Sequence, residues 1–218
     1  MIGLQGHEAL GESRWPAAVA VVVAIVLQLR LPENLSVGPS YVVPALALVL
    51  LIPLIITNPH RFTPQTRDLR VVSIALIAAM NAGNVSSLLL LLRRLINGTK
   101  VDGRSLMLSA VEIWLTSVIV FALWLWEIDR GGPIVRSRGV FTDPDLYFPQ
   151  MGDASLTSRP WAPAFIDYLY VSLTNSTAFS PTDTLPLRTR TKLLMGAQSL
   201  ASLATIAVLG ARAVNILN

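Results

Sequence analysis

The sequence predicts an all-α integral membrane protein with about five transmembrane helices and a re-entrant, pore-helix-like segment before the last of them. Two observations lead to this fold class. Of the 218 residues, 53% are hydrophobic and 14% are charged, whereas about 25% are charged in a typical soluble domain. The apolar residues are also gathered in long runs, as the hydrocarbon core of a bilayer requires. We therefore expect a single membrane domain over residues 1–218.

The five predicted transmembrane helices are apolar runs separated by polar or turn-forming segments. Arg14 precedes the first run as it would in a signal peptide, but no cleavage site of small residues follows, so we expect a retained helix. The third run stops at Arg93 and Arg94, and the fourth ends in tryptophan followed by charged residues, the order expected at a membrane interface. The runs cover residues 15–31, 41–57, 71–92, 106–126 and 193–217.

Residues 163–186 form a segment of a different kind, because their apolar part is too short to cross a bilayer comfortably. Pro163 and Asp167 suit the start of a helix, where proline needs no hydrogen-bond partner and a carboxylate favours the helix dipole. Polar side chains then follow one another from Thr174 to Thr177. Non-helical backbone at membrane depth survives only where protein buries it or water surrounds it. The sequence therefore predicts a re-entrant, pore-loop-like segment here.

Two short patterns lie in this segment. The pattern Asp-x-Leu-Tyr-x-Ser begins at Asp167, and an Asp-x-x-Pro pattern begins at Asp183. Over about residues 163–215 the chain thus resembles the pore region of the two-helix potassium-channel superfamily. The resemblance implies a homo-oligomer, a tetramer in that family, that surrounds a path for inorganic cations. The filter-like residues it implies are Thr174, Asn175, Ser176, Thr177, Thr182 and Asp183.

The filter itself departs from that superfamily. Residues 177–182 read Thr-Ala-Phe-Ser-Pro-Thr, where a potassium filter has the glycines that let successive carbonyls turn toward the ion. Potassium selectivity is therefore not implied. Phe179 and Ser180, followed by Asp183 and a last helix, also resemble small bacterial multi-pass membrane proteins of uncharacterised activity. This second resemblance implies the bacterial inner membrane, that is, the cell's plasma membrane.

Several polar residues lie inside the predicted helices and are candidates for a pore lining or for helix packing. A charge at this depth costs about 2.5–3.5 kcal/mol, so Glu112 needs a partner, for which Arg212, Asn81 and Asn84 are candidates. Glu112 is either a proton or cation ligand or a structural hydrogen-bonding group. The others either line a pore or hold helices together. The set consists of Glu112, Asn81, Asn84, Gln198 and Ser202.

Other functional classes have little support in the sequence. There is no cysteine, and the two histidines, His7 and His60, lie far from any carboxylates with ligand spacing. No nucleophile, phosphate-loop or metal motif is present, so we expect no enzyme, no catalytic residue, no metal and no cofactor. The net charge of +4 suits loops that contact anionic lipids rather than nucleic acid.

The functional expectation is a channel-like membrane protein that is not selective for potassium. A non-conducting structural or accessory protein and a proton-coupled transporter that uses Glu112 are the alternatives. Two signals for orientation disagree. The channel resemblance places the C-terminus in the cytoplasm, whereas eleven of the 17 Lys and Arg residues lie on the side of the N-terminus and the long loop, which favours that side as cytoplasmic.

Overall fold

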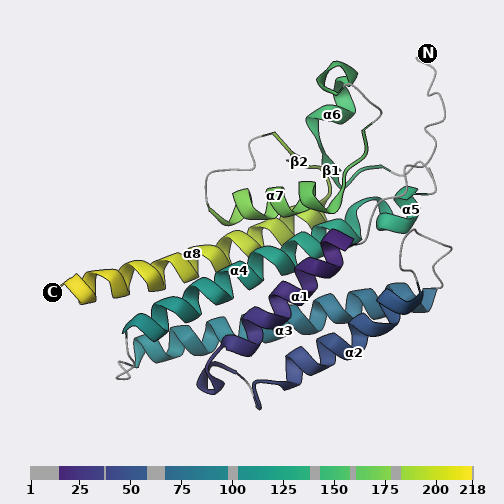
Figure 1. Cartoon of the computed structure of the whole chain (residues 1–218). Helices are drawn as coiled ribbons and strands as arrows, with labels where there is room; N and C mark the ends of the chain where they lie inside the picture. Colours follow the sequence, from purple (N-terminus) through teal and green to yellow (C-terminus); the bar gives the residue numbers. More distant parts are fainter. Residues whose placement is uncertain are drawn as a thin grey trace.

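The structure is a computed structural model that describes residues 15–36, 38–57, 67–97, 103–137, 143–157, 161–177 and 183–217. Five long helices run alternately in opposite directions and form a bundle (Figure 1). Short elements cover one end of this bundle, which we call the cap end, and we call the opposite end the far end. The long helices are α1 (Trp15–Arg30), α2 (Val42–Thr57), α3 (Arg67–Ile96), α4 (Gly103–Ile128) and α8 (Thr189–Leu217).

Three of these helices are long and apolar enough to cross a membrane. Their candidate spans are Asp68–Ile96, Gly103–Gly131 and Thr189–Gly210. Helices α1 and α2 have 16 residues each and rise about 24 Å, less than the hydrocarbon thickness of about 30 Å. The expected helical membrane protein is thus confirmed, with three spans rather than five established by length and composition.

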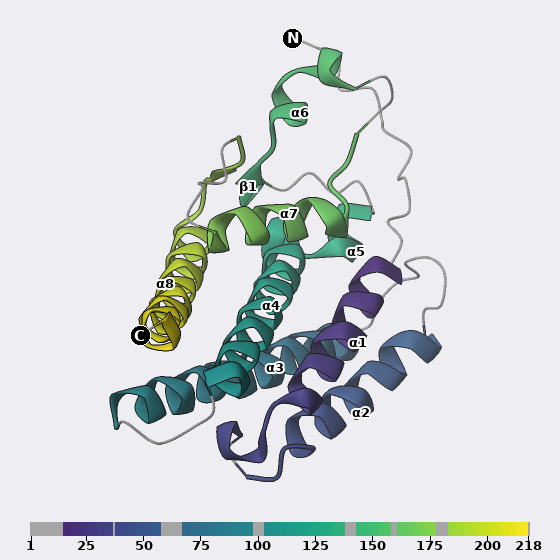
Figure 2. The same cartoon turned by 60° about the vertical axis from the view of Figure 1, so that its left-hand side comes forward.

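Helix α4 is the centre of the bundle. It packs against α1, α3, α7 (Phe165–Ser176) and α8, and in Figure 2 it runs between them. Of its apolar window 67% is buried, against 33% for the α3 window and 28% for the α8 window. The faces of α3 and α8 turned away from α4 are therefore available to lipid.

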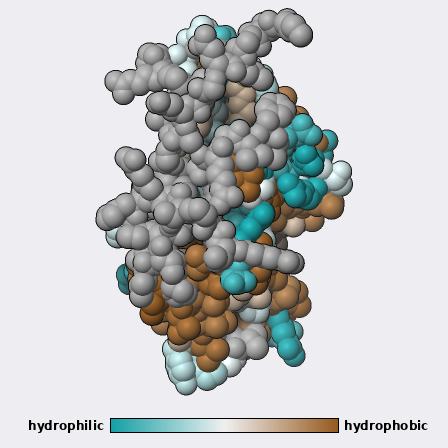
Figure 3. Space-filling model, turned by 90° about the vertical axis from the view of Figure 1, so that its right-hand side faces the viewer, coloured by the Kyte–Doolittle hydropathy of each residue, from teal (hydrophilic) through white to brown (hydrophobic). Residues whose placement is uncertain are grey.

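The outer surface of the bundle is apolar, as a lipid environment requires. Figure 3 shows a broad hydrophobic area over the lower part of the described surface. Large apolar side chains on four helices are strongly exposed, among them Val19, Val49, Leu89 and Leu200. In water such a surface would associate or aggregate, so this pattern agrees with the assignment to a membrane.

Helices α2 and α3 approach closely at Gly83. A Cβ atom on this residue would lie 2.9 Å from Cγ1 of Val43, so only glycine allows the two backbones to be this close. Ser86 and Ser87 each donate a hydrogen bond to the Gly83 carbonyl, at 2.8 and 3.0 Å. The two helices therefore pack closely at this position.

The cap end is built from short elements. Most of them lie in the long loop from Asp129 to about Pro160, where the sequence has neither helical nor alternating periodicity. The chain leaves α4 through a turn in which Arg130, Gly131 and Gly132 have positive φ, of 50°, 80° and 96°. The elements are η2 (Asp129–Gly131), α5 (Pro133–Ser137), β1 (Leu146–Tyr147), α6 (Pro149–Gly152), η3 (Ala154–Leu156) and β2 (Leu185–Pro186); η1 (Glu33–Leu35) lies at the far end.

Strands β1 and β2 connect the cap to the segment that precedes α8. They pair antiparallel, with Leu146 opposite Pro186 and Tyr147 opposite Leu185. The backbone of residue 187 continues this connection, because Leu187 donates its N–H to the Asp145 carbonyl at 2.9 Å. The chain is therefore attached to the cap immediately before α8 begins.

Candidate functional site

The predicted re-entrant segment is built around α7, which lies obliquely across α4 and α8 (Figures 1 and 2). Its first turn is closed by Asp167, whose Oδ2 accepts a hydrogen bond from the Ala164 N–H at 2.7 Å. Burial raises the pKa of this carboxyl group, and the hydrogen bond opposes the shift. Phe165 and Tyr168 are buried, whereas Tyr170 is 60% exposed. The expected helix start near Pro163 and Asp167 is confirmed.

The C-terminal half of α7 lies alongside the interior of the two neighbouring helices rather than at their ends. Ser172 Oγ donates to the carbonyl of Val118 at 2.7 Å, ten residues and about 15 Å before the end of α4. Asn175 Nδ2 donates to the carbonyl of Met195 at 2.9 Å, six residues and about 9 Å after the start of α8. Both ends of the segment lie at the cap end, since β2 pairs with β1.

A cluster of amide and hydroxyl groups joins α7 to α8. Gln198 is fully buried, and its Nε2 lies 2.9 Å from the Ser172 carbonyl, 2.6 Å from Ser172 Oγ and 2.6 Å from Ser176 Oγ. Its Oε1 accepts a hydrogen bond from Asn175 Nδ2 at 3.0 Å. Ser199 Oγ donates to Asn175 Oδ1 at 3.2 Å. We call Ser172, Asn175, Ser176 and Gln198 the amide cluster.

The remaining filter-like residues are not part of this cluster. Thr174 Oγ1 donates to the carbonyls of Tyr170 and Val171, at 2.9 and 3.0 Å. Thr177 Oγ1 donates to the Thr174 carbonyl at 3.1 Å. These bonds stay within the last turns of α7. Asp183 is exposed at the cap end, and Thr182 lies outside the described residues.

Two carboxylates at the cap end, Asp129 and Asp145, are completely buried. Asp129 Oδ2 accepts a hydrogen bond from the Tyr168 hydroxyl at 2.7 Å, and this contact fixes the start of α7 to the end of α4. Asp129 Oδ1 accepts from the N–H groups of Asp145 at 2.9 Å and Leu146 at 3.3 Å. We call Asp129, Asp145, Tyr168 and Arg190 the carboxylate network.

Asp145 connects this network to α8. The Arg190 guanidinium donates to both of its oxygens, through Nε at 2.5 Å and Nη2 at 2.8 Å, and the Arg130 N–H donates to Oδ2 at 2.9 Å. Burial disfavours the charged carboxylate. These hydrogen bonds and the charges of Arg190 and Arg188 outweigh it, so the pKa of Asp145 lies below its ordinary value. Asp145 is therefore a carboxylate at neutral pH.

Arg136 completes the junction between the cap and α7. Its Nη1 donates to the carbonyls of Trp126 and Asp129, both at 2.8 Å, and its guanidinium carbon lies 5.1 Å from the centre of the Tyr168 ring. The sequence reasoning missed this assembly. The one signal that was available is Asp129 itself, an acidic residue directly after an apolar run, which is also what an ordinary interface residue looks like.

Among the described residues Glu112 pairs with Arg30, which was not one of the three candidates from the sequence. Arg30 Nε lies 3.2 Å from Glu112 Oε1, and the Glu112 side chain is only 12% exposed. The pairing arises because α1 packs on α4 and ends at Arg30 beside the second turn or so of α4. The side chain of Arg212 lies outside the described residues. Arg70 and Glu127 form a similar pair at the cap end, at 3.6 Å.

The other predicted intramembrane residues point into the protein. Gln198 and Ser202 lie on the face of α8 that is buried in the protomer, together with Thr191, Met195 and Thr205. Within the described chain Ser202 Oγ has no hydrogen-bond partner. Asn84 is buried and Asn81 is half-buried. The exposed face of α8 carries apolar side chains instead, including Leu193, Leu200 and Leu203.

Among the described residues no group of three or more His, Cys, Asp or Glu side chains is arranged to hold a metal ion. Comparison of the chain with protein-family models, with curated proteins and with solved structures gives no match in any of the three. We therefore infer the function from the geometry of α4, α7 and α8.

Proposed function

We propose that this protein is a channel-like membrane protein in which α4, residues 163–186 and α8 form one subunit's share of an ion path. The observation that carries the proposal is the position of α7. Its segment begins and ends at the cap end, while the Ser172 and Asn175 side chains hydrogen-bond to backbone carbonyls well inside α4 and α8. A short helix held at this depth brings its own C-terminal end, with Asn175 and Thr177, close to the membrane interior.

The chemistry of that helix end favours a cation. The C-terminal end of a helix carries a partial negative charge of about half an elementary charge. Thr174 and Thr177 add hydroxyl oxygens there, and residues 177–182 supply no positive charge. One such segment cannot surround an ion, so several copies of the chain must assemble, four by analogy with the potassium-channel superfamily. With a degenerate filter, the path would not select potassium.

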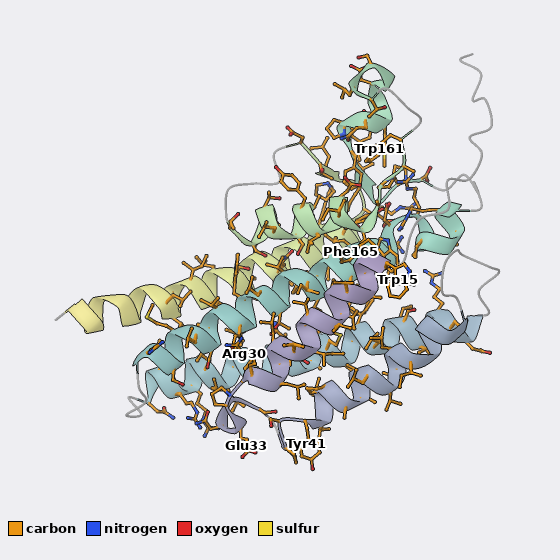
Figure 4. The ribbon with its side chains drawn as sticks, in the orientation of Figure 1. Trp15, Arg30, Glu33, Tyr41, Trp161 and Phe165 are labelled. Carbon is orange, nitrogen blue, oxygen red and sulfur yellow. The ribbon has the colours of Figure 1, made fainter. Side chains whose placement is uncertain are left out.

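The same proposal includes five crossings of the plasma membrane, of the bacterial inner membrane by the second resemblance. Helices α1 and α2 alternate in direction with their neighbours (Figure 1), and a bilayer adapts to helices of about 24 Å by local thinning or by snorkelling of flanking residues. Trp15 and Tyr41, which are labelled in Figure 4 and are 52% and 63% exposed, suit the two interfaces.

The channel resemblance supports an orientation with the far end in the cytoplasm. By position in the chain, the cap side carries eleven of the 17 Lys and Arg residues and the far side carries six, a count that on its own favours the cap side as cytoplasmic. Four of the cap-side residues belong to the long loop, however, and long loops have little influence on topology; without them the two sides carry seven and six basic residues. The C-terminus is then cytoplasmic, as the channel resemblance implies.

A non-conducting structural role is the second candidate, and the amide cluster favours it. Gln198 is fully buried and uses both ends of its amide within the protomer, so it offers nothing to a permeating ion. The transporter alternative has less support, because Arg30 already neutralises Glu112.

Cation flux into proteoliposomes separates these functions. The proposal predicts a flux that changes severalfold in Thr177→Val and in Asp183→Asn, because one removes a hydroxyl group at the helix end and the other a carboxylate at the mouth. Asp153→Asn is the matched control, since it removes an exposed carboxylate elsewhere on the cap. Absence of flux for all cations and voltages would contradict the channel and leave the structural role.

A further inference from the structure

The far end of the bundle carries four arginines around one apolar cluster. Leu31 and Leu35 pack there with leucines of α3 and with the first turns of α4, in a cluster formed by Leu31, Leu35, Leu88, Leu91, Leu106, Ala110, Ile113 and Val208. Arg93 and Arg94 lie in the last turn of α3, and Arg104 is the second residue of α4. Arg30, labelled in Figure 4, ends α1 and contacts Glu112, eight residues after Arg104 on α4.

By position in the chain, the far side carries more basic than acidic residues, six Lys and Arg against three Asp and Glu. The described acidic residues at the far end are Glu33 and Glu112. Glu112 contacts Arg30 through Nε, and the Arg30 side chain is 67% exposed. The outer edge of this guanidinium is therefore left to bind another group. At the cap end, by contrast, arginines are matched by carboxylates in the pairs Arg70–Glu127, Arg130–Asp129, Arg188–Asp143 and Arg190–Asp145.

We infer that this far-end surface, defined by Arg30, Arg93 and Arg104, binds the phosphate of an anionic phospholipid. A guanidinium donates two parallel hydrogen bonds to a phosphate, and it loses less hydration than an ammonium group in doing so. Arg93 and Arg104 are exposed, so their donors face the head-group region. The inference does not depend on ion conduction.

The neighbouring surface fits the rest of the lipid. Leu89, Ile96 and Leu108 are exposed by 60%, 81% and 51% on the same halves of α3 and α4 that carry the arginines. Acyl chains can therefore lie along these helices while the head group meets the arginines above them. A free phosphate ion would use only the charged part of this surface, which makes the lipid the better occupant.

The test is binding of phosphatidylglycerol, phosphatidylcholine and glycerol 3-phosphate to the full chain in detergent, measured by native mass spectrometry. We expect selective binding of phosphatidylglycerol. In the double variant Arg93→Gln/Arg104→Gln the affinity for this lipid should fall about 30-fold, at about 1 kcal/mol for each basic residue lost. Arg188→Gln/Lys192→Gln removes the same charge from the cap end and should leave the affinity unchanged.

Three results would overturn the inference. They are equal binding of both lipids, an equal loss of affinity in the cap-end variant, and glycerol 3-phosphate that binds as tightly as the lipid, which would indicate a free-phosphate site. Arg93→Lys/Arg104→Lys keeps both charges and should retain most of the binding, so a loss caused by misfolding would be recognised.

Discussion

The two ends of α7 are held by assemblies of different chemistry. Its first turns are attached to the cap by the carboxylate network, in which Asp129 accepts from Tyr168 and Asp145 binds Arg190. Its last turns are attached to α8 by the amide cluster, which contains no charge. The difference follows position. Ionised groups lie at the end of the spans, close to the interface, and neutral amides lie deeper, where a charge costs several kcal/mol.

The comparison also indicates which assembly is more sensitive to change. An ion pair with a fully buried carboxylate depends on both partners, because the remaining charge has no water to solvate it. A neutral cluster loses hydrogen bonds but leaves no charge behind. The cap-end assembly should therefore show larger single-substitution effects than the amide cluster.

The largest effect is expected for Arg190→Met. This substitution leaves the buried Asp145 without its main partner and should lower the free energy of unfolding by about 3 kcal/mol or more, measured by denaturation in mixed detergent micelles. Arg188→Gln removes an exposed pair with Asp143 and only a longer contact with Asp145, at 4.0 Å, and should cost less than about 1 kcal/mol. If Arg190→Met were as mild as Arg188→Gln, the network would not stabilise the cap.

The double variant Asp145→Asn/Arg190→Met sharpens this prediction. It removes the buried charge together with its partner, so part of the lost stability should return. A double variant that is less stable than Arg190→Met would show that the carboxylate oxygens, through their other hydrogen bonds, matter more than the charge.

A smaller effect is expected for Gln198→Leu. The leucine leaves Ser172 Oγ, Ser176 Oγ and the Asn175 amide without their shared partner and should cost about 1–2 kcal/mol in the same denaturation measurement. Ser199→Ala removes one hydrogen bond at the edge of the cluster and is the matched control. A cost for Gln198→Leu that exceeds that of Arg190→Met would contradict the ranking of the two assemblies.

The carboxylate network should also make stability depend on acid pH. The pKa of Asp145 is lower in the folded protein than the unfolded value of about 3.9. Its contribution is therefore complete above that value and is lost as the pH falls through the folded pKa. Below about pH 4 this one group should reduce stability by up to about 1.4 kcal/mol per pH unit.

Thermal melting of the wild type and of Asp145→Asn between pH 2 and pH 7 measures this dependence. The variant should lack the part of the acid slope that Asp145 contributes. Identical slopes would show that other carboxylates cause the acid sensitivity.

The smallest effect is expected at the far end. Glu112→Gln removes the charge that Arg30 neutralises and should cost about 1 kcal/mol or less, whereas Arg30→Gln leaves a mostly buried charge and should cost more. Denaturation of the two variants compares them. A larger cost for Glu112→Gln would mean that the carboxylate has a role beyond this ion pair.

The long helices could be predicted from the sequence because lipid selects for apolar runs. Their ends were predicted less well. Helix α3 extends over Arg67–Ile96 rather than residues 71–92, since charged residues in the first and last turns lie at the head groups and continue the helix without being apolar. The helix start at Asp167 was predictable because its cap is local, three residues from Ala164.

The side-chain contacts that hold α7 in place could not be predicted, because they join residues that are far apart in the sequence. Asp145 lies 16 residues from Asp129 and 45 from Arg190, so no local pattern relates them, and each resembles an ordinary charge at an interface. Arg30 was missed as the partner of Glu112 because that pairing depends on how α1 packs on α4. Gln198 and Ser202 were recognised as polar residues of the last helix, but the sequence did not show that they face the protein interior, because this depends on how α7 packs against α8.

The most direct test of the account is the water accessibility of Thr177. The chain has no cysteine, so Thr177→Cys and Leu203→Cys each carry a single thiol, one at the end of α7 and one on the exposed apolar face of α8. In proteoliposomes a charged thiosulfonate reagent added on the cap side should modify Thr177→Cys much faster than Leu203→Cys. Equal protection of both thiols would contradict a water-lined, re-entrant segment.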